Sequence, residues 1–151
     1  MALDWSCRAA QALTTAELYA ALVLRARVFV VEQQCAYPDP DGLDLAADVW
    51  HLFGWQDGEL HAYLRLLGAV RDEVVIGRVI VAPEGRGSGL GHRLLEEALR
   101  VCAERWPGRP LFLAAQAHLQ AYYGRYGFMP CSAVYDEDGI PHIDMRRLAT
   151  A

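Results

Sequence analysis

The strongest chemical signal in the chain is a glycine-rich stretch, Pro83-Glu84-Gly85-Arg86-Gly87-Ser88-Gly89-Leu90-Gly91. Its four glycines stand at alternate positions, so the backbone can turn tightly and approach a ligand without obstruction by Cβ atoms. An apolar run precedes it and an amphipathic stretch follows it, a pattern that predicts strand, loop and helix. Because the first N–H groups of a helix lack intrahelical partners and carry partial positive charge, we expect an anion such as phosphate to bind here.

The spacing of the glycines excludes two common phosphate-binding loops. A dinucleotide fingerprint, Gly-x-Gly-x-x-Gly, would need its third glycine at Leu90 or His92, counted from Gly85 or Gly87. A mononucleotide P-loop needs Gly-Lys-Ser/Thr, and no lysine follows any of these glycines. The pattern that fits is Arg/Gln-x-x-Gly-x-Gly/Ala after an apolar-x-Val-x-Pro strand end, here Val79-Ile80-Val81-Ala82-Pro83 followed by Arg86-Gly87-Ser88-Gly89-Leu90-Gly91.

That pattern resembles the acyl-CoA loop of the GNAT N-acetyltransferases. Further along the chain, Tyr123-Gly124-Arg125-Tyr126-Gly127-Phe128 is similar to the Tyr-x-x-x-Gly-Phe signature of the same family, in the same order. Longer segments resemble the ElaA subgroup of bacterial GNAT proteins, among them Val30-Val31-Glu32-Gln33 and Tyr135-Asp136-Glu137-Asp138-Gly139-Ile140-Pro141-His142. The alternative interpretation is a glycine-rich turn that binds nothing.

The resemblance implies a cofactor site in which backbone N–H groups hold the CoA pyrophosphate and the preceding strand hydrogen-bonds the pantetheine arm. Acetyl-CoA is then the expected cosubstrate. The residues assigned to it are Val79, Ile80, Val81, Arg86, Gly87, Ser88, Gly89, Leu90, Gly91 and His92. Arg93, one turn into the helix, either reaches a CoA phosphate or lies on a solvated helix face. Because backbone atoms would bind the ligand, substitution of Ser88 should matter less than substitution of the glycines.

The family reaction is direct attack by an amine on the thioester, which needs a base for the ammonium proton and an acid for the leaving thiolate. The resemblance places Tyr123 beside the sulfur as the acid, and a phenol stays protonated at neutral pH. Its alternative role is aromatic packing, the role expected of Tyr122 and Tyr126. The base candidates are His118, His142 and Glu32, with a water chain as an equal alternative. Gln116 departs from the family, many members of which carry Asn there.

Two other kinds of chemistry are disfavoured. A covalent mechanism through Cys35 and His142 is unnecessary for the family reaction, and cysteine is commonly buried. A metal site built from His118, His142 and an Asp lacks any helical His-x-x-x-His spacing, so no metal is expected. In the stretch from Gln33 to Asp48, an EF-hand register that starts at Tyr37 also fails, because its first and last positions are not the required ligands.

That same stretch carries Asp39, Asp41, Asp44 and Asp48 among turn-forming residues. A solvated acidic loop is the favoured interpretation, because charged loops usually face water. The alternative is a substrate-side wall that attracts a cationic amine.

Sequence patterns predict the elements that position these residues. Thr14 and Glu17 form a capping box ahead of a helix over about residues 16–27, and Asp57-Gly58 predicts a hairpin. An amphipathic helix with a Glu96–Arg100 pair is expected from Leu90 to Arg105. A second amphipathic helix is expected over residues 116–126, with Gly127 as its C-cap. Strands are expected over 49–55, 60–67, 73–81, 111–115, 132–136 and 140–147.

Together these elements predict one α/β (α+β) domain over residues 1–151. It would contain a mixed sheet of six to seven strands flanked by helices. The resemblance adds that acyl-CoA lies between two parallel strands that splay apart, those ending at Val81 and Ala115.

Composition restricts partners and location. The formal net charge is -5 and no basic stripe is visible, so nucleic acid is not expected as a partner. The N-terminus does not resemble a leader and no run of 18 apolar residues occurs, which predicts a cytoplasmic protein that does not enter the membrane. The four scattered cysteines, Cys7, Cys35, Cys102 and Cys131, predict free thiols. Edge strands could pair with a second subunit to give a homodimer.

The predicted function is transfer of an acetyl group from acetyl-CoA to a primary amine of a small molecule or protein. A non-catalytic acyl-CoA sensor and a GNAT-like synthase of an acylated signal remain as alternatives.

Overall fold

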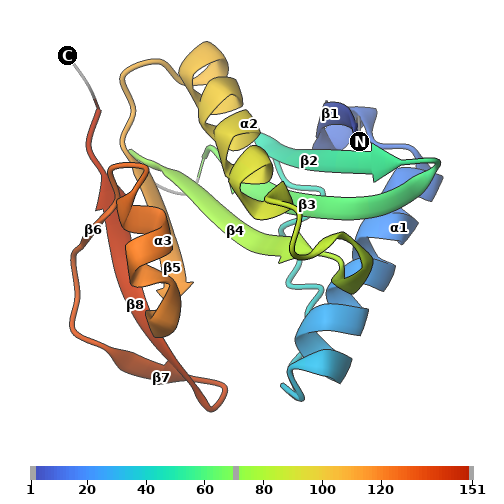
Figure 1. Cartoon of the computed structure of the whole chain (residues 1–151). Helices are drawn as coiled ribbons and strands as arrows, with labels where there is room; N and C mark the ends of the chain where they lie inside the picture. Colours follow the sequence, from blue (N-terminus) through green and yellow to red (C-terminus); the bar gives the residue numbers. More distant parts are fainter. Residues whose placement is uncertain (1–2, 70–71, 150–151) are drawn as a thin grey trace.

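A computed structural model describes residues 3–69 and 72–149 of the chain. In it, eight strands form one mixed sheet in the order β1-β2-β3-β4-β5-β8-β6, with β7 also paired to β8 (Figure 1). All neighbouring pairs are antiparallel except β4 and β5. The strands are β1 (Asp4–Ala9), β2 (Val49–Gln56), β3 (Glu59–Leu67), β4 (Val74–Val81), β5 (Leu111–Gln116), β6 (Met129–Pro130), β7 (Tyr135–Glu137) and β8 (Ile140–Arg147).

Helices cover both faces of this sheet. One face packs against α2 (Leu90–Arg105) and α3 (Gln120–Gly124), with Leu94 and Tyr123 in the same core as Leu64 of β3. The other face packs against α1 (Thr15–Arg25) and its π-helical continuation η2 (Ala26–Glu32). Short 3-10 turns complete the set, η1 (Ala10–Ala12), η3 (Pro83–Gly85) and η4 (Ala117–Leu119).

Local sequence signals fix several of these elements as predicted. The Thr14 hydroxyl accepts from the Glu17 backbone N–H at 3.0 Å, and the Glu17 carboxylate accepts from the Thr14 N–H at 2.9 Å, so the capping box is confirmed. Asp57 and Gly58 both have positive φ, 51° and 79°, as the turn of a two-residue hairpin requires. The four cysteines are free thiols, as expected.

The two parallel strands separate after a short contact. β4 and β5 pair only at Val74–Leu111, Val75–Phe112 and Ile76–Leu113, although both strands continue beyond those residues. Just past the last pair, Arg78 has a positive φ of 53°, and the register between β3 and β4 shifts at this point. A bulge of this kind bends the strand away from its neighbour. The predicted splay of parallel strands is therefore present.

The α/β class is confirmed, but the expected six to seven strands are eight. The predicted set lacked β1, although its sequence Asp4-Trp5-Ser6-Cys7-Arg8-Ala9 alternates polar and apolar residues as a half-buried edge strand does. It also lacked β6, which has only two residues, one of them proline. Two local expectations were wrong as well. Gln116 ends β5 instead of starting a helix, and Arg100 bonds Glu97 and Glu104 instead of Glu96.

Candidate active site

The glycine loop leaves the start of α2 open to a ligand. Gly87 and Gly89 adopt positive φ of 84° and 75°, which side chains rarely tolerate. Within the described residues, no heavy atom lies within 4 Å of where a Cβ at either position would be. Gly89 is the N-cap of α2, and none of the described side chains caps that helix. The first-turn N–H groups of α2 are thus available to an anion, as the sequence predicted.

Two tyrosines hold this helix start in place. The Tyr122 hydroxyl donates to the Gly91 carbonyl at 2.5 Å, and the Tyr126 hydroxyl shares a 2.6 Å hydrogen bond with Nδ1 of His92. A Cβ added at Gly91 would lie 3.4 Å from the Tyr122 hydroxyl, so this glycine permits the close approach. Tyr122 of α3 and Tyr126, which follows α3, were expected only to pack in the core, but they also bond the start of α2 after the glycine loop.

The loop is also tied to the helix on the other face of the sheet. Arg86 donates through Nε to the Val81 carbonyl at 3.1 Å and through both Nη atoms to Glu32, at 2.6 and 2.7 Å. Arg27 forms a second ion pair with Glu84. The hydrogen bond from Arg86 lowers the pKa of Glu32, so this carboxylate is ionised and already engaged. Glu32 does not line the cavity between the strands.

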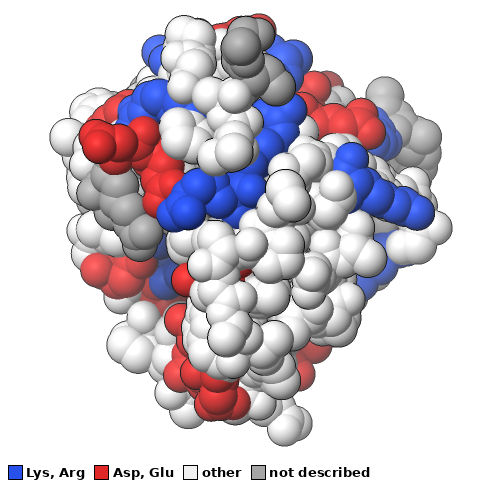
Figure 2. Space-filling view, turned by 90° about the vertical axis from the view of Figure 1, so that its left-hand side faces the viewer, with Lys and Arg blue, Asp and Glu red and all other residues white. Residues whose placement is uncertain are grey.

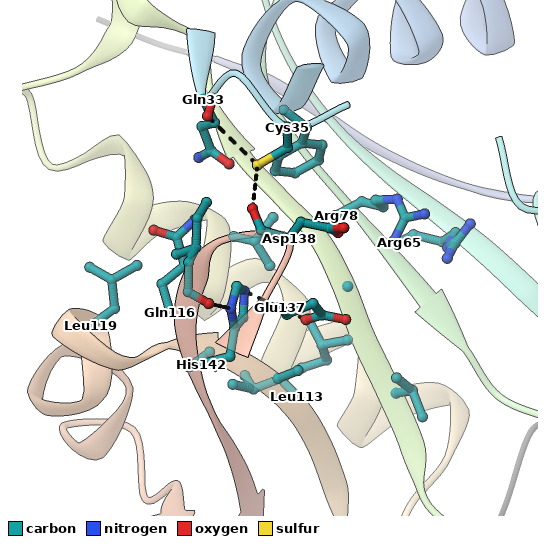
Figure 3. Close-up of a pocket in the computed structure, with 18 of the residues that line it drawn as sticks. Gln33, Cys35, Arg65, Arg78, Leu113, Gln116, Leu119, Glu137, Asp138 and His142 are labelled. Carbon is teal, nitrogen blue, oxygen red and sulfur yellow. Dashed lines mark hydrogen bonds and ion pairs between the residues drawn. The ribbon is translucent and has the colours of Figure 1, made fainter. Parts of the chain in front are cut away.

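That cavity, of about 490 Å³, lies where β4 and β5 separate (Figure 3). Its floor includes Gly77 of β4 and Ala114 of β5, and no described atom lies within 4 Å of a Cβ built on Gly77. One wall comes from the segment that follows η2 and the other from the β7–β8 hairpin, while α3 closes the inner end. The polar side chains lining it are Gln33, Cys35, Tyr37, Asp41, Arg65, Arg78, Gln116, Tyr123, Glu137, Asp138 and His142.

Tyr123 lies at the inner end of the cavity and is only 5% exposed. Burial raises the pKa of its phenol to about 12, so the hydroxyl keeps its proton throughout the physiological range. Val79 of β4 lines the same space, whereas Ile80 is buried in the core under α1. The structure therefore brings the predicted acid to one cavity with Val79, but with neither Ile80 nor Val81, of the strand predicted to hold the pantetheine.

The three candidate bases lie in different places. His142 lines the cavity, and its Nδ1 hydrogen-bonds the Ile140 carbonyl at 2.8 Å. Because a carbonyl only accepts, Nδ1 carries the proton and Nε2 is left with a lone pair. Nε2 lies 3.7 Å from the Glu137 carboxylate. His118 is exposed and lines a separate depression with Gln120 and Pro130, so of the three only His142 shares the cavity with Tyr123.

The acidic stretch is not a solvated loop. Asp39 and Asp44 are 4% and 8% exposed, and both bond the fully buried Arg25, at 2.7 and 2.6 Å. Arg65 reaches Asp44 at 3.0 Å as well. The expectation of a hydrated loop was therefore wrong for Asp39 and Asp44, because arginines from α1, β3 and β4 draw these two carboxylates inward, whereas Asp41 and Asp48 are exposed.

Asp41 completes this cluster of Arg25, Arg65, Arg78, Asp39, Asp41 and Asp44, named here the arginine–aspartate cluster. Burial opposes the charge of Asp41, but hydrogen bonds from Arg65, at 2.7 Å, lower the pKa of its carboxyl to about 2. Arg78 binds Asp39 at 2.9 Å. With three cations for three anions the cluster is neutral, so the alternative of a free acidic wall for a cationic substrate has no support here.

The cluster instead supports one wall of the cavity. The Tyr37 hydroxyl donates to Asp39 at 2.9 Å, which positions the segment that carries Cys35. The Cys35 thiol lies 3.6 Å from both the Gln33 and Asp138 carbonyl oxygens, so it joins this wall to the β7–β8 hairpin (Figure 3). Its thiol is directed to backbone oxygens and not to His142. This geometry does not support the covalent mechanism through Cys35 and His142 that the sequence already disfavoured.

Sequence reasoning did not assign five of the polar lining residues to the site, namely Gln33, Arg65, Arg78, Glu137 and Asp138. One signal was available for Arg78, because a charged residue after glycine inside an apolar strand marks a bulge.

In the described part of the chain, no group of three or more His, Cys, Asp or Glu side chains could hold a metal ion. Of the helices in residues 3–69 and 72–149, none is long and apolar enough to cross a membrane.

Comparisons with known proteins agree with this geometry. The family described as an acetyltransferase (GNAT) domain matches residues 47–149. Protein ElaA of Escherichia coli strain K12 is 48% identical over 147 residues, covering 96% of both chains. The crystal structure of Escherichia coli ElaA superposes with a TM-score of 0.93 at 47% identity, covering 97% of this chain and 99% of that one.

Two further solved structures extend the comparison. An acyl-CoA N-acyltransferase from Pseudomonas aeruginosa is 57% identical with a TM-score of 0.94, covering 97% of this chain and 99% of that chain. An aminoglycoside 6'-N-acetyltransferase complexed with coenzyme A is 13% identical with a TM-score of 0.70, covering 96% of each chain. At that identity the likeness concerns the fold alone, and it is a fold that holds coenzyme A.

Proposed function

Since this chain belongs to the GNAT acetyltransferase family, we propose that it is an acyl-CoA-dependent N-acyltransferase that transfers an acetyl group from acetyl-CoA to a primary amine. The observation that carries the proposal is that Tyr123 and His142 line one and the same cavity, at the point where β4 and β5 separate. The open glycine loop at the N-terminus of α2 supports the cofactor part of it. The name of the Pseudomonas aeruginosa relative agrees with this reaction class.

Each residue has a distinct part in the proposed reaction. Backbone N–H groups of the loop from Arg86 to His92 would hold the pyrophosphate, and β4 would hold the pantetheine beside Val79. His142 Nε2 would take a proton from the incoming ammonium, which frees the nitrogen lone pair to form the C–N bond. As the C–S bond breaks, the Tyr123 hydroxyl would donate its proton to the departing thiolate. The nitrogen loses a second proton as the amide forms, and this proton would return the Tyr123 phenolate to the phenol. The reaction then releases one net proton, carried by His142, and needs no covalent enzyme intermediate.

Carboxylates on the hairpin wall favour a cationic acceptor. Glu137 and Asp138 are exposed and line the cavity, and among the described residues neither forms an ion pair with an arginine. This contrasts with the neutral arginine–aspartate cluster on the opposite wall. The protonated amine would therefore be attracted from the hairpin side, next to His142. A small primary amine and a protein amine both satisfy this requirement.

The test is an assay of free thiol released from acetyl-CoA in the presence of a panel of small and peptidic amines. Tyr123→Phe should lower kcat by roughly 10²–10⁴ while leaving CoA affinity, measured by calorimetry, within about twofold. His142→Gln, which removes the basic nitrogen, should also lower kcat by roughly 10²-fold or more while leaving CoA affinity unchanged. Because the chain contains 14 arginines and no lysine, acylation of its own lysine side chains cannot contribute to the signal.

Two outcomes would contradict the proposal. Tight acetyl-CoA binding without turnover of any amine would favour an acyl-CoA sensor. A strong preference for long acyl donors over acetyl would favour synthesis of an acylated signal. Full activity of Tyr123→Phe would remove this phenol from the mechanism.

A further inference from the structure

The cavity between the strands extends well beyond the groups that the proposed reaction uses. On β5, Phe112, Ala114 and Gln116 all line it, and alternate residues of a strand face the same side of the sheet. Gln116 lies opposite His142, whereas Phe112 is four residues back along the strand, a distance of roughly 13 Å. The cavity therefore continues from the proposed reaction centre along the sheet, toward the start of β5.

Apolar side chains from three neighbouring strands form the far end of this path. Val75 of β4 pairs with Phe112 of β5 on one side and with Leu67 of β3 on the other, and all three line the cavity. Leu67 and Phe112 are 6% and 8% exposed, and Val75 packs against the small core that contains Leu67. These three residues, named here the apolar end, provide a continuous hydrocarbon surface for a ligand.

The middle of the path is open and carries no net charge. Gly77 and Ala114 follow the last pair of β4 and β5, and no described atom lies within 4 Å of a Cβ built on Gly77. Arg65 lines this section, but it already bonds Asp41 at 2.7 Å and Asp44 at 3.0 Å. Because the arginine–aspartate cluster is neutral, an uncharged chain crosses this section at the least cost in desolvation.

One segment of the chain follows the path from the hairpin to the arginine–aspartate cluster. The Cys35 thiol lies 3.6 Å from the Asp138 carbonyl oxygen, and the Asp41 carboxylate lies 2.7 Å from Arg65 (Figure 3). Tyr37, which lies between these two contacts in the sequence, lines the cavity as well. A slender ligand fits such an enclosed path, whereas a protein main chain does not.

Charge is concentrated at the hairpin end of the path. Asp136, Glu137 and Asp138 follow one another in the β7–β8 hairpin, and the last two line the cavity. In Figure 2, carboxylates gather at the lower end of the molecule, the height at which Figure 1 places this hairpin. The two ends of the path therefore differ, since one attracts a cation and the other offers hydrocarbon.

We propose that the acceptor is a small primary amine that carries an apolar group at the far end of an uncharged chain. Its ammonium lies next to His142 and the hairpin carboxylates, its chain crosses Gly77, and its apolar group packs against the apolar end. This inference rests on the proposed function, because His142 fixes where the nitrogen lies. An internal lysine of a protein fits less well, since its main chain begins only four carbons from the nitrogen and would enter the enclosed path.

Calorimetric titration measures this selectivity without any need for turnover. Phenylbutylamine, with its amine and phenyl groups at opposite ends, should bind roughly tenfold or more tightly than butylamine, because only phenylbutylamine reaches the apolar end. The preference should appear with CoA present and without it. Gly77→Leu places a side chain across the path and should remove the preference.

A second variant changes the apolar end without narrowing the path. Val75→Thr keeps the shape of the side chain but adds a hydroxyl, so the preference for phenylbutylamine should fall by about threefold or more. Val23→Thr makes the same change at a site on α1 that is 49% exposed. It is the matched control and should keep the native ratio of the two affinities.

The outcomes separate this inference from the reaction itself. Equal affinities for the two amines, no binding of either, or a preference that survives Gly77→Leu would each overturn it. Tighter binding of a short peptide with one internal lysine would overturn it as well. A clear preference for phenylbutylamine without release of free thiol from acetyl-CoA would contradict the proposed transfer and support the elongated amine site. Circular dichroism establishes that every variant is folded.

Discussion

Two loops border the proposed active site, and they use charge in opposite ways. The segment that carries Asp39, Asp41 and Asp44 is rich in carboxylates, yet Arg25, Arg65 and Arg78 neutralise them inside the fold. The glycine loop has little side-chain charge directed at a ligand, because Arg86 and Glu84 are both engaged with residues of η2. The anion binding that we propose for it would come from main-chain N–H groups at a helix start that lacks a side-chain cap.

The difference shows that the number of charged side chains in a segment says little about ligands. Buried carboxylates need partners, and once paired they stabilise a wall instead of attracting a substrate. Main-chain N–H groups are present in every segment, and what distinguishes the glycine loop is that its conformation leaves them unpaired. Three predictions test this division between a structural loop and a binding loop.

The largest expected effect is on stability. Arg25→Ala would leave Asp39 and Asp44 buried without their main partner, and breaking such a buried pair typically costs about 3–5 kcal/mol. Urea unfolding should show this loss in the free energy of unfolding. Arg8→Ala, which removes the exposed pair with Glu17, is the control and should change it by less than about 1 kcal/mol. Equal effects of the two substitutions would show that the arginine–aspartate cluster is not structural.

The next effect is on cofactor binding. Gly89→Val would force a branched side chain into the left-handed region, at roughly 1–2 kcal/mol, and would move the N–H groups that follow. Calorimetry with CoA should show at least a tenfold weaker affinity. Ser88→Ala removes only a hydroxyl that donates to the Gly85 carbonyl, so its affinity should stay within about threefold of the native value. Normal CoA binding by Gly89→Val would contradict a main-chain site.

The smallest effect appears in acid. The pKa of Asp41 is about 2 in the folded protein, below its value near 3.8 in an unfolded chain. A lowered pKa means that the carboxylate stabilises the fold fully above about pH 4 and that this contribution is lost as the pH falls toward 2. Compared with Asp41→Asn, the native protein should therefore lose on the order of 1 kcal/mol more stability between pH 4 and pH 2. Parallel acid-unfolding curves for the two proteins would refute this role.

The sequence predicted the binding loop better than the structural one, for a physical reason. Glycine spacing, a capping box and Asp-Gly turns act over a few residues, so Gly89, Thr14 and Asp57 could be interpreted locally. The partners of Asp39 are Arg25, 14 residues away, and Arg78, 39 residues away. No short pattern shows which arginine meets which aspartate, and the acidic segment was accordingly interpreted as hydrated.

The catalytic candidates show the same limit. Tyr123 belongs to a motif, so its place in the cavity was expected, whereas His118, His142 and Glu32 could not be ranked from the sequence. Their ranking depends on the pairing of β8 with β5, which brings His142 opposite Gln116. The edge strand β1 was also missed, although the alternation of polar and apolar residues that places Trp5 and Cys7 against the core was a signal for it.

The brief pairing of β4 with β5 also bears on how the chain folds. β1 to β4 form a meander of neighbouring antiparallel strands, and β5, β7 and β8 form a second unit, while three residue pairs join the two halves across the sheet. Those pairs close a long stretch of chain that includes all of α2, so they belong to the contacts of greatest sequence separation. We expect them to form late and, in native-state hydrogen exchange, to open early. The cavity proposed for the substrate then lies at the seam between the two halves of the sheet, where we expect a small opening motion to break the fewest backbone hydrogen bonds.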